Sequence, residues 1–132
     1  MAGITNTASV AELIGRWYPG DLAYIEKLEY QSGSETRPAR ILLVGVMQRC
    51  DEVNGGWPSE TSPRFRVTIL FDGVRDLELK GFGQYPRQIM GFDIVDVSDR
   101  GLEGVSFMVE DYENGDLQFT CSSVDILDVM RV

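Results

Sequence analysis

Aspartate and glutamate are the candidate catalytic and metal-binding residues of this sequence. Asp93, Asp96 and Asp99 follow one another at intervals of three. Paired carboxylates act as acid and base in glycoside hydrolysis, and carboxylate clusters bind metal ions. In an undistorted strand, however, residues three apart point to opposite faces. We therefore expect exposed acids at strand ends and turns, with a carboxylate-based hydrolase kept as an alternative.

Histidine is absent from all 132 residues, which excludes Ser-His-Asp and Cys-His catalysis and imidazole ligation of zinc. Cys50 and Cys121 are the only cysteines, and neither belongs to a CxxC pair, so a cysteine metal site is not expected. We predict two reduced thiols in the core, with a disulfide between them as the less favoured alternative. The run Asp111, Glu113, Asp116 does not follow the calcium-loop pattern. These features predict a protein that is not an enzyme and has no cofactor or metal.

The net charge of −9 is concentrated in the last third of the chain. Residues 1–88 hold 11 acids and 10 bases, whereas residues 89–132 hold 10 acids and two bases, a net of −8. The excess has two interpretations: a solvated surface that keeps the protein soluble, or a docking surface for a basic partner. The acidic balance argues against binding to nucleic acid, which requires clustered Lys and Arg.

Three aromatic residues lie in segments that resemble turns or loops. Trp57 lies in the long irregular stretch 51–63, Tyr85 lies beside Pro86, and Tyr112 lies among acids. Exposed Trp and Tyr side chains are frequent interface anchors, although each could also fold back over the core. The partner-binding residues that we predict are Asp99, Glu110, Asp111, Tyr112, Glu113, Asp116 and Trp57.

The element that precedes all strands is predicted to be a short helix over residues 9–16. Ser9 and Glu12 have the spacing of a capping box, and Pro19-Gly20 would end the helix. Residues 22–131 then read as seven or eight strands separated by turn signals. We expect one domain over residues 1–132, mainly β, built as a single antiparallel meander sheet, a sandwich or a barrel.

Three turns allow the pairing of neighbouring strands to be predicted from the match of apolar residues. A three-residue loop ending at Gly115 pairs Val109 with Phe119 and Phe107 with Cys121. A similar loop at 71–73 would pair Val67 with Leu77 and Phe65 with Leu79. A four-residue loop at 98–101 would pair Ile94 with Val105 and Phe92 with Phe107.

Residues 64–94 carry a recognisable pattern of alternating apolar positions. It consists of Phe65-x-Val67-x-Ile69-x-Phe71, Val74-x-x-Leu77-x-Leu79-x-Gly81-Phe82, Gln84, Ile89 and Phe92-x-Ile94. This stretch, with Trp17 before the first strand and the closing Leu117-x-Phe119-x-Cys121, resembles the immunity protein 50 family of bacterial polymorphic-toxin systems. The resemblance implies a mostly β protein that binds and neutralises a cognate toxin, with no catalytic residues.

The resemblance and the composition lead to one expected function. The N-terminus has no basic region followed by an apolar core, so we expect a cytoplasmic protein rather than a secreted one. The toxin domain would be the partner, and a basic, nuclease-like toxin would fit an acidic surface. A small-molecule-binding β-barrel, with Trp57 and Tyr85 at its mouth, remains the alternative.

Overall fold

Two antiparallel sheets make up most of the computed structural model, which describes residues 3–48, 63–80, 87–88, 92–111 and 115–132. The first sheet runs in the order β5 (Arg87–Gln88), β1 (Leu22–Gln31), β2 (Arg40–Gln48), β3 (Arg64–Asp72) and β9 (Ser123–Arg131). The second runs in the order β4 (Arg75–Leu79), β8 (Leu117–Cys121), β7 (Phe107–Asp111) and β6 (Phe92–Asp96). We call them the five-stranded and the four-stranded sheet.

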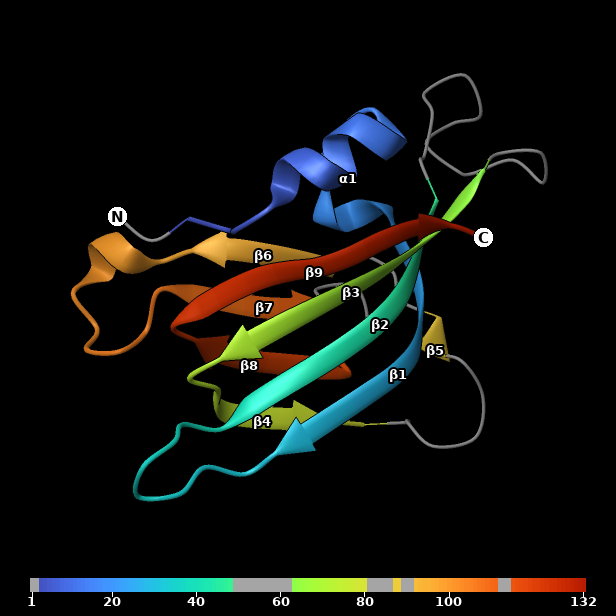
Figure 1. Cartoon of the computed structure of the whole chain (residues 1–132). Coiled ribbons are helices and arrows are strands. Elements are labelled where there is room, and N and C mark those ends of the chain that lie inside the picture. Colours follow the sequence, from blue (N-terminus) through green and yellow to red (C-terminus); the bar gives the residue numbers. More distant parts are fainter. Residues whose placement is uncertain (1–2, 49–62, 81–86, 89–91, 112–114) are drawn as a thin grey trace.

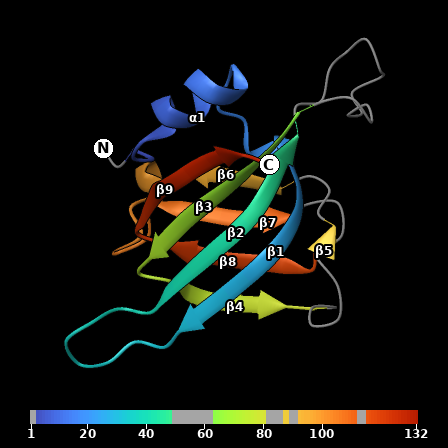
Figure 2. The ribbon, with the colours of Figure 1, turned by 45° about the vertical axis from the view of Figure 1, so that its right-hand side comes forward.

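The two sheets stack face to face, and their strands run obliquely to one another (Figures 1 and 2). Within the described residues the sheets are not closed into a barrel. The mainly β class and the short N-terminal helix are therefore confirmed, and of the three expected architectures the structure has the sandwich. No helix in the described ranges has the length and apolar character that a membrane crossing requires.

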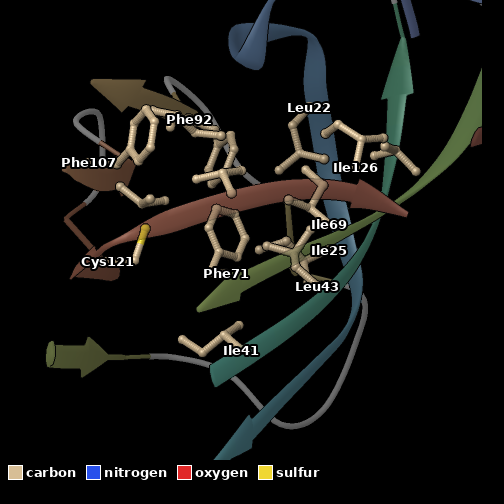
Figure 3. Packing of buried hydrophobic residues seen from close by; sticks show 14 of the residues in the cluster. Leu22, Ile25, Ile41, Leu43, Ile69, Phe71, Phe92, Phe107, Cys121 and Ile126 are labelled. Atoms are coloured by element: carbon tan, nitrogen blue, oxygen red, sulfur yellow. The ribbon is translucent and has the colours of Figure 1, made fainter. Parts of the chain in front are cut away.

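The core lies between the sheets and is filled by the inward residues of each strand. Phe65, Val67, Ile69 and Phe71 alternate along β3 and are all buried, as their spacing predicts. The rings of Phe71 and Phe119 join the two layers, with centroids 5.0 Å apart and planes at 81°. Figure 3 shows residues of both sheets meeting in this cluster. Burying each large side chain contributes about 1.5–3 kcal/mol.

The predicted helix is present but begins and ends earlier than residues 9–16. Helix α1 spans Thr7–Ile14, and no side chain caps its start. The carbonyl of Asn6 (φ 68°) accepts the N–H of Ser9, which places Ser9 in the first turn and not at the N-cap. Gly15 (φ 100°) ends the helix by donating its N–H to Ala11, before Pro19 is reached. Val10 and Ile14 form its buried face, and it packs along β9 (Figure 1).

The hairpin register predicted around Gly115 is confirmed, because Val109 faces Phe119 and Phe107 faces Cys121. The register predicted around 71–73 is wrong. This segment carries the chain from β3 in one sheet to β4 in the other, so the two strands do not pair.

The register predicted around 98–101 is also wrong, since Ile94 pairs with Val109 and Phe92 with Asp111. The turn there is longer than four residues. It contains a short 3₁₀ helix at Ser98–Arg100, and β7 does not begin until Phe107.

Cys121 lies on the inward side of β8, and its thiol is free and buried. The expectation of a reduced core cysteine is met at this position, while Cys50 lies outside the described residues. Burial, with a smaller contribution from the charge of Asp72, raises the pKa of the Cys121 thiol to about 12.

Candidate functional site

The outer face of the four-stranded sheet is the face that is turned away from the five-stranded sheet (Figures 1 and 2). Along β7, Phe107 and Val109 point inward, so Met108 and Glu110 point outward. Along β8, Phe119 and Cys121 point inward, so Gln118 and Thr120 point outward. The strict alternation of these strands therefore places polar and charged side chains on one exposed face.

The strand pairings align four outward residues into one row across this sheet. Glu78 of β4 faces Gln118 of β8, Gln118 faces Glu110 of β7, and Glu110 faces Asp93 of β6. We call these four residues the acidic row. Three of its four members are carboxylates, and Glu110 and Asp93 stand directly opposite each other.

Glu78, Asp93 and Glu110 form no ion pair within the described residues. Asp93 uses one carboxylate oxygen to accept the N–H of Ile94 at 2.8 Å, and this bond leaves its negative charge in place. Like charges directly opposite each other in a sheet are destabilising. The acidic row is therefore a concentration of negative charge that the fold itself does not compensate.

The neighbouring row consists of Arg75, Thr120, Met108 and Val95. Its cation points away from the acids, because Nη1 of Arg75 donates to the backbone carbonyl of Glu103 at 3.2 Å. Met108, Thr120 and Val95 are half-buried and add a partly apolar strip beside the acidic row. An acidic strip beside an apolar one is a surface that a basic protein partner can dock against.

The outer face of the five-stranded sheet differs in part, since it has paired charges beside two acids, Asp125 and Asp128, that form no ion pair among the described residues. Arg66 of β3 reaches Glu26 of β1 through two hydrogen bonds of 2.7 and 3.3 Å. The hydrogen bond to Glu26 is the main reason that the pKa of Arg66 is raised. Arg40 also lies 3.7 Å from Asp72. The five-stranded sheet thus carries both paired and unpaired charges on its described outer face, whereas all three acids of the acidic row are unpaired.

The structure separates the predicted partner-binding residues into groups. Glu110 belongs to the acidic row, and Asp116 lies just before β8 at the same end of the sheet. Asp99 is exposed but lies at the opposite end, in the β6–β7 connection. Trp57, Tyr112 and Glu113 lie outside the described residues.

Asp111 is the one predicted site residue whose exposure is contradicted. Its side chain is 0% exposed and belongs to the inward register of β7, opposite Phe92. Its Oδ1 accepts the N–H of Leu117 at 2.9 Å, and its backbone carbonyl accepts the N–H of Gly115 at 2.8 Å. Asp111 therefore holds the turn between β7 and β8 and presents no side chain to a partner. Its other oxygen, Oδ2, is buried without a hydrogen-bond partner.

Asp93 and Asp96 do point to opposite faces, as their spacing of three predicts. Asp93 faces Glu110 on the outer side, whereas Asp96 faces the inward residue Phe107. The hydroxyl and N–H of Ser98 donate to Asp96 at 2.6 and 2.9 Å, and these bonds lower its pKa. Asp96 is thus a local structural residue at the start of the β6–β7 connection.

Glu78 and Asp93 are members of the acidic row that we did not predict as partner-binding residues. The alternation around Ile94 places Asp93 on the polar face, so the sequence contains a signal for it. Glu78 is different, because β4 contains a bulge between Arg75 and Glu78 and its residue Asp76 has a φ of 56°. Arg75 and Glu78 consequently share a face although they are three residues apart.

Two hollows lined by described residues open on the surface of the five-stranded sheet. One, of about 350 Å³, lies between the start of α1 and β9. The other, of about 250 Å³, lies over Leu42, Leu70 and Leu127.

The space between the sheets is filled by fully buried side chains such as Phe71, Phe92 and Phe119. Because the described sheets are not closed, the expected β-barrel is wrong, whereas binding of a small molecule stays a prediction. Among the described residues no group of three or more Cys, Asp or Glu is arranged to hold a metal ion.

Comparison of the chain with known protein families, with curated proteins and with solved structures gives no significant match.

Proposed function

We propose that this chain is a non-catalytic binding protein that neutralises a cognate bacterial toxin domain by docking it on the acidic row. The observation that carries this proposal is the direct opposition of Glu110 and Asp93, with Glu78 in the same row. Facing carboxylates lower the stability of a sheet, so they serve no purpose for the fold alone. Binding of a basic partner would offset the repulsion between these carboxylates with favourable electrostatic interactions.

The charge distribution supports a basic partner. Residues 89–132 carry a net charge of −8, and Asp93 and Glu110 belong to this segment. Complementary charge raises the rate of association and discriminates among partners more than it adds to affinity. A nuclease toxin has to bind phosphate, so its active cleft would carry positive charge and would fit this surface.

The toxin-neutralising role draws on the resemblance of residues 64–94 to the immunity protein 50 family. A protein of this kind acts in the cytoplasm of the producing cell, and we place this chain there. It needs no active site of its own. The carboxylates of the acidic row suit such a role, because they lie on a sheet face and line neither of the two hollows formed by described residues.

Co-expression with a neighbouring toxin domain tests this function. The probe is the C-terminal domain of the toxin, where the gene directly upstream of this chain encodes one, produced with and without the chain in the same bacterial host. We expect the chain to protect the cells and to co-purify with the toxin domain as a one-to-one complex. Continued killing with no complex formed, while the chain is folded and abundant, would refute the proposal.

A further inference from the structure

Strand β9 forms one edge of the five-stranded sheet, and only part of that edge is occupied. Thr5 pairs with it as a parallel bridge, donating its N–H to the carbonyl of Val124 and accepting the N–H of Ile126. The side chain of Asn6 then donates to the carbonyl of Ile126 at 3.1 Å. The segment before α1 thus already behaves as a short added strand, and it leaves β9 where the helix begins.

Beyond Asn6 the outward backbone groups of β9 have no partner among the described residues. Val132 donates its N–H to Arg64 of β3, which fixes the direction of the alternating groups. Val129 and Arg131 therefore direct both N–H and C=O away from β3. Neither residue has a further backbone hydrogen bond within the described part of the chain. An edge of this kind is ready to pair with another extended segment.

Space for such a segment exists at the same place. The hollow of about 350 Å³ is lined by Asn6 and Ser9 on one side and by residues 126–129 of β9 on the other. Figure 1 shows α1 lying beside β9. The hollow lies next to the unpaired groups of Val129, so an added strand could begin there and continue past Arg131.

We propose that the open half of the β9 edge binds an extended segment of a basic partner by strand addition. Main-chain hydrogen bonds to Val129 and Arg131 would supply affinity, as in other cases of strand addition to a sheet edge. Asp128 is exposed in the hollow and would meet a lysine or arginine of the segment. A second copy of the chain is disfavoured as the occupant, because each copy has a net charge of −9. This site is separate from the acidic row.

A titration of the isotope-labelled full chain with a synthetic peptide tests the proposal by NMR. The probe is a blocked octapeptide of alternating valine and lysine. We expect the amide signals of Val129 and Arg131 to shift and to gain protection from exchange. A matched peptide that is N-methylated at alternate residues cannot form the main-chain bonds and should bind at least about tenfold more weakly.

Three variants sharpen the test. Asp128→Asn should weaken binding about threefold, the effect of one exposed ion pair. Arg131→Pro removes an outward N–H at an exposed position, so it should abolish protection at this edge while the fold is kept. Met130→Pro removes an N–H that is directed at β3, so it should instead destabilise the sheet. This variant is the control for the loss of hydrogen bonds within the sheet.

Several results would overturn the proposal. They are equal binding of the N-methylated peptide, unchanged binding by folded Arg131→Pro, or equal binding of a valine–glutamate octapeptide. NMR shifts confined to the acidic row would also overturn the strand-addition proposal. They would leave the acidic row as the docking surface of the proposed function. If the peptide binds at β9 but the toxin domain does not bind the chain, the strand-addition proposal would stand and the proposed function would fail.

Discussion

A Cβ atom on Gly73 would overlap the Oγ of Ser122. These two residues sit at two of the places where the chain passes between the sheets, from β3 to β4 and from β8 to β9. Ser122 donates both its N–H (2.9 Å) and its hydroxyl (3.1 Å) to the carbonyl of Asp72. These two crossings therefore form one hydrogen-bonded corner, in which a side chain at position 73 would displace the Ser122 hydroxyl from the Asp72 carbonyl.

Gly73→Ala should destabilise the protein strongly, because it combines a clash with a strained backbone at φ +69°. Gly101→Ala is the matched control, since its φ is +71° and nothing lies within 4 Å of the added Cβ. The control should lose about 1–2 kcal/mol, and Gly73→Ala at least about 1 kcal/mol more. Urea denaturation measures both changes. Equal losses would show that the corner can open to admit a methyl group.

The acidic row should cost stability in the free protein. Glu110→Gln removes the charge facing Asp93, so it should raise the free energy of unfolding by about 0.2–1 kcal/mol at low salt. The gain should shrink at high salt, where charges are screened. Glu26→Gln, which breaks the pair with Arg66, should lower stability under the same conditions. A Glu110→Gln variant that is less stable than the wild type would contradict the assigned geometry.

Asp111 should behave as a structural residue and not as a docking residue. Asp111→Ala leaves the N–H of Leu117 buried without its acceptor, which should cost about 1–3 kcal/mol. Asp111→Asn keeps an oxygen for that N–H and should be more stable than the alanine variant. Both folded variants should bind the partner with the wild-type salt dependence. If Asp111→Asn alone flattened that dependence, Asp111 would belong to the docking surface.

Ionisation of Cys121 should lower stability at alkaline pH. The thiol ionises near its ordinary value of 9.0 when exposed by unfolding, but only near 12 in the fold. Between these values the folded state holds one more proton, so stability falls as pH rises, by up to about 1.4 kcal/mol for each pH unit. Below pH 9 the thiol is protonated in both states and contributes no slope.

The control for this prediction is Cys121→Ala, because tyrosine and lysine titrate in the same range. The difference in the free energy of unfolding between wild type and Cys121→Ala should shrink above pH 9 and stay constant below it. A difference that stays constant to pH 11 would mean that the buried thiol ionises as readily as an exposed one.

The alternation of apolar residues and the positions of turn glycines predicted part of this fold. The β7–β8 register was predictable because Gly115 has the positive φ that its turn requires, and because only one register matches apolar residues. Gly73 also has a positive φ, and the same reasoning gave a hairpin there. A glycine with a positive φ is equally compatible with a hairpin turn and with a connection between two sheets. The contact with Ser122, which is distant in sequence, distinguishes these two outcomes.

The candidate site was predicted to a similar extent. The acidity of the last third and the outward position of Glu110 follow from composition and alternation. The acidic row does not, because it needs the β4–β8 pairing and the bulge at Asp76 that turns Glu78 outward. Asp111 was misplaced for a related reason. Its polarity suggests exposure, but its register is inward and its oxygen is used by the turn.

The acidic row is proposed to steer the association of a basic toxin domain. The association rate constant with such a domain, measured by stopped flow at several salt concentrations, tests this steering. The variant Glu78→Gln/Asp93→Asn/Glu110→Gln removes three charges from the row. The control Glu12→Gln/Glu29→Gln/Glu35→Gln removes three exposed charges elsewhere. We predict that the row variant associates about tenfold more slowly at low salt and loses most of its salt dependence, whereas the control changes little. Equal rates and equal salt slopes for the two variants would contradict the claim.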